Sequence, residues 1–326
     1  MEDKILDVNN LKTYFHTFKG VVKAVDGVSF DLKKGEILGI VGESGGGKSV
    51  TGFSLLKLIE EPGRIEGGQI LFKGEDIVNK SEKEMKDIRG SEISMIFQDP
   101  MTSLNPLYTI QQQMEEVLKL HTEMNAKERK ARCIQLLKDV GIPQPAERLN
   151  SYPHQFSGGM RQRVIIATAL AAEPELIIAD EPTTALDVTI QSQILKLMER
   201  LVKEKQTSLI LITHDLAVVS EMVDRVIVLY CGKVLESGTI DDIIYQSAHP
   251  YTNGLLGSIP RLHDDKKRLT QIPGMVPNMF ELPVGCNFAP RCSYAKEKCE
   301  SVEPEIREIF EGHQVSCHFP LKGADS

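Results

Sequence analysis

The sequence has no apolar run long enough to cross a membrane. Its longest uninterrupted run covers residues 164–172 and includes Thr168, whereas a membrane-spanning helix needs about 20 apolar residues. The first residues, MEDKILDVNN, are acidic and contain no apolar segment of the kind that secretory signals carry. We therefore expect a protein that stays in the cytosol or lies peripherally on a membrane protein.

Basic charge and closely paired cysteines are also scarce. The net charge of −8 leaves no basic footprint for nucleic acid. Four of the six cysteines lie between residues 286 and 317, with the spacing C-x5-C-x6-C-x17-C. This spacing lacks the C-x-x-C pairs of common zinc ribbons. In a cytosolic protein such clustering favours metal binding over disulfides.

A glycine-rich loop is the strongest motif in the chain. Residues 42–49 read GESGGGKS and lie between an apolar predicted strand, 37–41, and a predicted helix. The spacing G-x-x-x-x-G-K-S is that of a phosphate-binding loop, in which backbone N–H groups and the helix N-terminus cradle phosphates. Lys48 is expected to reach the terminal phosphates and Ser49 to ligate Mg²⁺. The alternative is a glycine-rich turn with a solvated lysine.

An acidic pair follows a second apolar run. Residues 176–179, LIIA, lead into Asp180 and Glu181. A carboxylate at the end of a buried strand can hold Mg²⁺ through its hydration shell, and we assign that role to Asp180. Glu181 is expected to polarise the attacking water as general base. An acidic turn without function is the alternative.

Two further polar residues end predicted strands. His214 follows the strand 208–213, and ligands bind at the carboxyl edge of open α/β sheets. His214 could therefore hydrogen-bond the γ-phosphate and orient Glu181. Gln98 ends the strand 93–97, where its amide could ligate Mg²⁺ and sense the γ-phosphate. Each is weak evidence alone, because a strand-end histidine is often structural.

Residues 156–160, FSGGM, predict a helix that begins with Ser157, Gly158 and Gly159. A helix N-terminus of this composition is a second anion site. Since the first loop already cradles one set of phosphates, this element indicates a site completed across a dimer. An ordinary helix cap is the alternative.

The order of elements predicts an α/β fold. Strands alternate with helices, which favours a mostly parallel sheet. Residues 5–41 are rich in strands, and apolar residues recur at helical spacing from about 106 to 156. Within this block Cys133 is expected to be a small core residue. After about residue 238 prolines and cysteines accumulate, which indicates a smaller, loop-rich unit.

These motifs occur in the order found in ATP-binding cassette (ABC) ATPases, which residues 1–240 resemble. The resemblance implies a P-loop NTPase domain with an antiparallel β subdomain, an inserted helical subdomain at about 100–172, and a small Pro- and Cys-rich C-terminal domain, 241–326. It also implies a head-to-tail dimer around two ATP, in which Ser157, Gly158 and Gly159 act on the partner's nucleotide. Residues 185–187 match the D-loop, and FSGGM stands where LSGGQ is commonest.

The same resemblance supplies the set of expected site residues. Lys48, Glu181 and His214 would be catalytic, and Ser49, Gln98 and Asp180 would hold Mg²⁺. The residues expected to bind ATP are Phe15 (with Tyr14 in reserve), Gly42, Ser44, Gly45, Gly46, Gly47, Lys48, Ser49, Val50 and Gln98.

The tail resembles the C-terminal extension of oligopeptide, dipeptide and nickel importer ATPases, through HPYT at 249–252, IPG at 272–274 and GCNFAPRC at 285–292. Members with this cysteine pattern carry a [4Fe–4S] cluster, which implies Cys286, Cys292, Cys299 and Cys317 as its ligands. Zn²⁺ or free thiols remain alternatives. A structural role is favoured over a redox one. His313 and His318, which flank Cys317, are expected to take no part.

The resemblance implies the ATPase subunit of a peptide importer on the cytoplasmic face of the cell membrane. Its expected partners are a paralogous ATPase or a second copy, two integral-membrane permease subunits docked on the helical block 100–155, and indirectly an extracytoplasmic solute-binding protein. A nickel or other small-solute importer is one alternative. A soluble ABC ATPase of DNA repair or translation is the alternative from another class. It would need a heptad insertion, fused cassettes or a basic surface, and the sequence has none of these. A P-loop kinase is disfavoured by residues 156–160 and the acidic pair.

Overall fold

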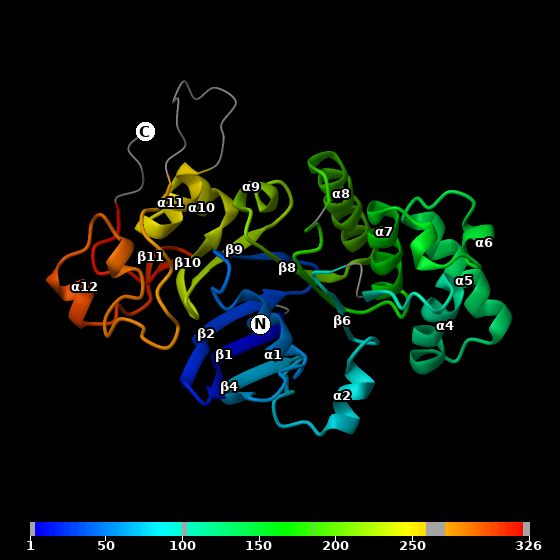
Figure 1. Cartoon of the computed structure of the whole chain (residues 1–326), viewed down its shortest axis with the longest axis horizontal. Helices are drawn as coiled ribbons and strands as arrows, with labels where there is room; N and C mark the ends of the chain where they lie inside the picture. Colours follow the sequence, from blue (N-terminus) through cyan, green and yellow to red (C-terminus); the bar gives the residue numbers. More distant parts are fainter. Residues whose placement is uncertain (1–3, 100–102, 185, 259–270, 322–326) are drawn as a thin grey trace. The chain divides into compact units, whose positions relative to one another are not determined.

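The computed structural model describes residues 4–99, 103–184, 186–258 and 271–321 (Figure 1). The chain divides into two compact units. The first combines Met1–Lys33, Ile37–Val78 and Ile212–Ser326, and the second combines Lys34–Glu36 and Asn79–Leu211. The division between residues 211 and 212 falls inside the strand β8 (Ser208–Thr213).

The first unit is rich in strands. Its strands are β1 (Lys4–Thr17), β2 (Gly20–Lys33), β3 (Ile37–Val41), β4 (Gly63–Phe72), β5 (Glu75–Asp76), β9 (Arg225–Tyr230), β10 (Lys233–Thr239), β11 (Arg307–Phe310) and β12 (His313–Val315). Its helices are α1 (Lys48–Leu55), α9 (Leu216–Val219), α10 (Ile240–Tyr245), α11 (Pro250–Gly257), α12 (Glu297–Ser301) and the 3-10 helix η2 (Ala289–Arg291).

The second unit is mainly helical. Its helices are α2 (Glu82–Ile88), α4 (Ile110–His121), α5 (Ala126–Asp139), α6 (Pro145–Arg148), α7 (Gly158–Ala169), α8 (Val188–Lys205) and the 3-10 helix η1 (Pro153–Gln155). Its strands are β6 (Ile93–Ile96) and β7 (Leu176–Asp180).

Two sheets organise the first unit. One is antiparallel, with the order β2-β1-β4-β5, as the sequence analysis expected for an antiparallel β subdomain. In the other, β3 pairs parallel with β9, and β10, β12 and β11 follow in antiparallel pairs. Strands β9 and β10 form a hairpin, as the sequence at residues 227–230 and 232–235 predicts. The C-terminal strands β12 and β11 were not predicted; they extend this sheet from across the proposed domain boundary at residue 240.

In the second unit, β6 pairs parallel with β7, and the α/β class is confirmed. Figure 1 shows α4, α5, α6 and α7 gathered together, and α5 contacts the other three. Their apolar faces bury Met114, Leu136 and Cys133. Burial raises the pKa of the Cys133 thiol to about 12, so this cysteine is an inert core residue, as predicted.

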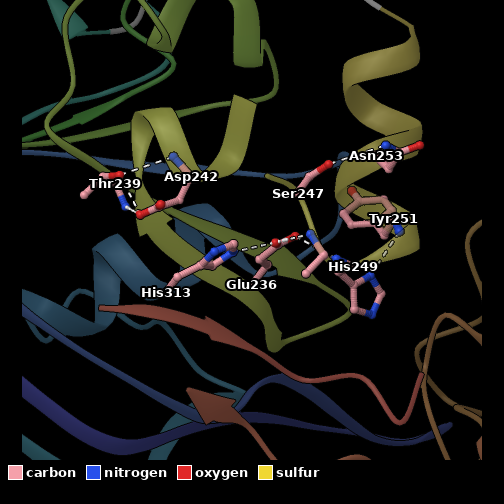
Figure 2. A network of polar contacts seen from close by, with 9 residues as sticks. Glu236, Thr239, Asp242, Ser247, His249, Tyr251, Asn253 and His313 are labelled. Carbon is pink, nitrogen blue, oxygen red and sulfur yellow. Dashed lines mark hydrogen bonds and ion pairs between the residues drawn. The ribbon is translucent and has the colours of Figure 1, made fainter. Parts of the chain in front are cut away.

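A buried carboxylate ties three elements of the first unit together. Glu236, in β10, is fully buried and accepts hydrogen bonds from the backbone N–H groups of Ala248 (2.6 Å) and His249 (3.0 Å). Nε2 of His313, in β12, lies 2.8 Å from the same carboxylate (Figure 2). Because a buried carboxylate needs several partners, Glu236 fixes both β12 and the start of α11 on β10.

We expect Glu236→Gln to lower the free energy of unfolding by roughly 2–4 kcal/mol, because the amide NH₂ would face one of the two backbone N–H groups that now donate to the carboxylate. Denaturant or thermal unfolding monitored by circular dichroism measures this change. Glu311→Gln, at an exposed position, is the matched control and should leave stability unchanged. Equal stability of Glu236→Gln and the wild-type protein would contradict this role.

Candidate functional site

The phosphate-binding loop joins the buried strand β3 to helix α1, as predicted. Two of its glycines are sterically required. A Cβ atom at Gly42 would lie 2.1 Å from the carbonyl oxygen of Leu229, and one at Gly47 would lie 2.2 Å from that of Ala24. Gly47 also has a φ of +96°, a conformation that side chains rarely adopt. The loop is therefore fixed by the backbone around it.

Lys48 lies folded into this loop. Its ammonium group donates hydrogen bonds to the carbonyl oxygens of Gly42 (2.8 Å) and Glu43 (3.0 Å), and the residue is only 4% exposed. The N–H of Gly46 donates to the same Glu43 oxygen at 3.1 Å. These contacts place the positive charge of Lys48 at the centre of the loop, beside the N-terminus of α1, where anions bind favourably.

The acidic pair lies at the end of β7 in the second unit. Every residue of β7 is buried, and Asp180 is 1% exposed. The parallel pairing of Ile96 with Ala179 sets Gln98 opposite Glu181, two residues beyond the last pair. Gln98 Nε2 donates to Glu181 Oε2 at 2.9 Å, so the structure brings these two predicted residues together.

Glu181 is further restrained by a residue that the sequence analysis missed. The hydroxyl of Thr184 donates to the same Oε2 atom at 2.9 Å. Glu181 itself has a φ of +44°, and strained backbone of this kind is concentrated at functional sites. A threonine three residues after a glutamate carries no signal by itself, because only the turn after β7 brings them together.

Helix α7 begins as predicted. Ser157 is its N-cap and accepts a hydrogen bond from the N–H of Met160. Phe156 is buried, whereas Ser157 and Gly158 are exposed and Gly159 is half-buried. The N-terminus of this 12-residue helix therefore faces solvent, where it could meet an anion.

Three other predicted residues belong to the first unit. Phe15, in β1, is half-buried and packs over Gly63, its partner in β4. The Tyr14 hydroxyl instead donates to Asp26 Oδ1 at 2.5 Å, which leaves Phe15 as the better candidate for adenine stacking. His214 is exposed at the end of β8, and its neighbour Asp215 caps helix α9.

The four late cysteines line one small pocket. Cys286, Cys292, Cys299 and Cys317 all contribute to it, together with His318 and aromatic side chains. In the part of the chain that the structure describes, no group of three or more His, Cys, Asp or Glu is arranged to hold a metal ion. His318 Nε2 is hydrogen-bonded to the carbonyl oxygen of Val302 at 2.9 Å. His313 lies instead on Glu236.

Comparison with known proteins identifies the family. The dipeptide transport ATP-binding protein DppD of Escherichia coli (strain K12) is 48% identical over 98% of both chains. This chain belongs to the oligopeptide/dipeptide transporter family of ABC ATP-binding proteins. DppD of Bacillus subtilis (strain 168) is 52% identical, covering 97% of this chain and 94% of its own. OppD, the oligopeptide transport ATP-binding protein of the same organism, is 53% identical over 96% of this chain and 88% of its own.

Family profiles and solved structures agree with this membership. The profile described as ABC transporter matches residues 25–184, and the profile for the oligopeptide/dipeptide transporter C-terminal region matches residues 235–299. The dimeric, post-hydrolysis structure of the ATP-binding cassette MJ0796 has a TM-score of 0.65 at 29% identity, covering 72% of this chain and 98% of that one. Clostridium perfringens cbiO1 has a TM-score of 0.64 at 30% identity, covering 74% and 91%. The predicted ABC ATPase fold and enzyme class are confirmed.

None of the helices in the described ranges of this ABC ATPase combines the length and apolar character needed to cross a membrane.

For this ABC ATPase we expect Thr184→Val to reduce the kcat of ATP hydrolysis about 10- to 100-fold, since a group that orients a catalytic carboxylate commonly has an effect of that size. The KM for ATP should change little, because Thr184 does not belong to the phosphate-binding loop. Thr184→Ser keeps the hydroxyl and should restore turnover. Steady-state kinetics measures both constants. Equal turnover of Thr184→Val and Thr184→Ser would contradict this assignment.

Proposed function

We propose that this chain is the ATP-hydrolysing subunit of a dipeptide or oligopeptide importer. One observation carries the proposal: the chain joins a cassette segment, 25–184, to a C-terminal region of the peptide-transporter type, 235–299. In this proposal residues 1–240 form the nucleotide-binding domain, with the helical subdomain at about 100–172, and residues 241–326 form the extension. The relatives named above, covered almost end to end, are named for peptide transport.

Nucleotide binding is assigned to the phosphate-binding loop. Phe15 would stack on the adenine. The residues that would surround the phosphates are Gly42, Ser44, Gly45, Gly46, Gly47 and Val50. Lys48 would move from the loop carbonyl oxygens to the phosphate oxygens. Oxygen donors of Ser49, Gln98 and Asp180 suit Mg²⁺, which neutralises charge on the phosphates when bound. The Gln98–Glu181 hydrogen bond uses the amide nitrogen of Gln98, so its oxygen would contact the metal.

Hydrolysis is assigned to Glu181 as general base. Its carboxylate is held through Oε2 by Gln98 and Thr184, and a fixed carboxylate can accept a proton from water in one defined direction. His214 would hydrogen-bond the γ-phosphate. Gln98 would sense the γ-phosphate, and its hydrogen bond to Glu181 would link the position of the base to the bound nucleotide.

A second cassette would complete the site. Ser157, Gly158 and Gly159 lie at the solvent-facing N-terminus of α7, where the helix dipole favours an anion supplied by another subunit. The proposed partner is a paralogous ATPase, with a second copy as the other candidate. Two permease subunits and, through them, a solute-binding protein would complete an importer whose ATPases lie on the cytoplasmic face of the membrane.

The permease contact is assigned to the helical subdomain. Leu107, Tyr108 and Leu120 are 80%, 51% and 72% exposed, respectively, on and just before α4. Large apolar side chains this exposed favour a protein partner.

Uptake of labelled peptides tests the proposed function. In cells where the variant replaces the wild-type copy of this subunit and the rest of the transporter is intact, Glu181→Gln should abolish uptake of a labelled dipeptide, because ATP would bind but barely hydrolyse. Glu204→Gln, an exposed change on α8, is the matched control and should transport normally. Uptake of nickel but not of peptides by the wild-type protein would reassign the cargo.

The same variant tests the assigned base. Purified Glu181→Gln should bind ATP with near wild-type affinity, lose at least about 100-fold in kcat, and accumulate as ATP-bound dimers in size-exclusion chromatography. Turnover at the wild-type rate would remove Glu181 from its proposed role.

We further propose that Cys286, Cys292, Cys299 and Cys317 hold a structural [4Fe–4S] cluster, with Zn²⁺ as the competing group. All four line one pocket, and thiolates are the ligands of both groups. Burial raises the pKa of the Cys286 and Cys292 thiols, and burial raises that of Cys317 to about 11, with the neighbouring cysteines adding to each effect. Thiolates at these three positions would therefore need bound positive charge, which the iron of a cluster or Zn²⁺ would supply.

Backbone donors around the sulfur atoms support this assignment. Phe288 and Ala289 donate backbone hydrogen bonds to Cys286, Tyr294 donates to Cys292, and Phe319 donates to Cys317. N–H groups directed at sulfur stabilise the thiolate form and tune iron–sulfur clusters. The turns after these cysteines are thus suited to hold charged sulfur.

Anaerobic purification tests the cysteine assignment. We expect visible iron–sulfur charge-transfer absorbance and about four iron atoms per chain, both lost in Cys299→Ser. Cys133→Ala, at a buried cysteine outside the pocket, is the matched control and should retain the iron. Zinc without iron in the wild-type protein would decide for the competing group.

A further inference from the structure

Arg291 connects the segment from Cys286 to Cys292, here called the cysteine loop, to the phosphate-binding loop. It ends the short helix η2, next to Cys292, and its side chain is only 4% exposed. Its guanidinium group forms a two-pronged contact with Glu43, through Nη1–Oε2 at 2.5 Å and Nη2–Oε1 at 3.0 Å. Nη1 also donates to the hydroxyl of Tyr230 at 3.2 Å, and Nε to the carbonyl oxygen of Pro273 at 3.0 Å. This set of contacts leaves Arg291 one orientation.

Glu43 is the second residue of the GESGGGKS loop, and the C-terminal segment holds it twice. Besides the Arg291 contact to its carboxylate, its backbone N–H donates to the hydroxyl of Tyr251, in α11, at 2.8 Å. The carbonyl oxygen of Glu43 accepts from Lys48 and Gly46. Glu43 thus contacts both the C-terminal segment and Lys48.

Buried contacts make these supports rigid. Tyr251 is fully buried, and its N–H donates to Nδ1 of His249, the N-cap of α11 (Figure 2). Burial lowers the pKa of His249 to about 3, so the ring stays neutral and Nδ1 can accept. The carboxylate of Glu236 anchors the backbone of His249, as described above.

The cysteine loop is packed on the same residues. Phe288, two residues after Cys286, lines the cysteine pocket and packs against Tyr230 and Tyr251 with ring centroids 5.4 and 5.3 Å apart. Within the segment from Cys286 to Cys292, Phe288 contacts both the cysteine pocket and the two tyrosines, while Arg291 contacts Glu43. A displacement of this segment would therefore act on Glu43 directly through Arg291, and through Phe288 and Tyr251.

The charge on Glu43 explains why this contact matters for nucleotide binding. A carboxylate inside a phosphate-binding loop repels the phosphates, and the repulsion is strong at a partly buried site. The guanidinium group of Arg291 neutralises this charge and fixes both carboxylate oxygens on itself. Arg291 is the cation that holds the Glu43 carboxylate, and it lies 248 residues away in the chain.

We propose that Arg291 is a positioning residue for ATP: it holds and neutralises Glu43, so that the affinity of the phosphate-binding loop depends on an intact cysteine loop. This inference rests on the proposed function, since it assumes that the loop binds ATP. It adds a role for the C-terminal extension in nucleotide affinity.

Titration of the full-length protein with a fluorescent ATP analogue tests the proposal. Arg291→Gln should raise the Kd at least about tenfold, because Glu43 is then charged and unpaired. Adding Glu43→Gln should return the Kd to within about threefold of the wild-type value, a coupling that independent sites do not show. In steady-state kinetics the loss should fall on the KM for ATP and not on kcat, which a general loss of structure would not produce.

Arg225→Gln is the matched control. Arg225 is a partly buried arginine of the same unit that donates to the carbonyl oxygen of Asp31 at 2.6 Å, and its loss should leave the Kd unchanged. Thermal unfolding establishes that each variant is folded. If Arg291→Gln does not fold, Arg291→Lys replaces it; lysine keeps the charge but not the two-pronged contact, so its Kd should rise about threefold.

The outcomes separate the two proposals. Wild-type protein that fails to bind ATP would overturn the proposed function. Wild-type protein that binds ATP, with a folded Arg291→Gln or Arg291→Lys variant of equal affinity, would overturn the role of Arg291 alone. A folded Arg291→Gln, Glu43→Gln double variant that binds ATP as weakly as Arg291→Gln would also overturn it. Repulsion between Glu43 and the phosphates would then not be the cause of the weaker binding.

Discussion

Close packing of the backbone around the phosphate-binding loop is the constraint on which the rest of the site depends. The carbonyl oxygens of Leu229 and Ala24 occupy the space that side chains at Gly42 and Gly47 would need. The loop is therefore shaped by its close packing against strands β9 and β2. This shape gives the Lys48 ammonium group two carbonyl oxygens to which it donates hydrogen bonds.

In the second unit, the pairing of two parallel strands fixes the position of Glu181. The register of β6 on β7 sets Gln98 opposite Glu181, and both belong to the segments that follow buried strands. Thr184 adds a second donor to the same carboxylate oxygen. A carboxylate held by two donors and an unusual backbone conformation has few orientations left, which suits a group that must act on one water molecule.

The C-terminal segment is more closely integrated than its composition predicts. Its prolines and cysteines indicate a separate, loop-rich unit, yet β12 pairs with β10, and Arg291 and Tyr251 both contact Glu43. The buried carboxylate of Glu236 joins these parts, because it requires donors from β12 and from the start of α11. The proposed metal pocket thus lies one residue layer from the aromatic side chains that support the phosphate-binding loop.

Sequence spacing alone determined the local motifs: the loop at 42–49, the strand ending in Asp180, the helix that begins after Ser157, and the four clustered cysteines. Each depends on residues near one another in the chain, so hydrophobic periodicity, glycine positions and caps are enough to predict it. Only the tertiary structure revealed Thr184 on Glu181, the buried Glu236 and the contact of Arg291 with Glu43. Partners up to 248 residues apart leave no local pattern, because packing and not spacing brings them together.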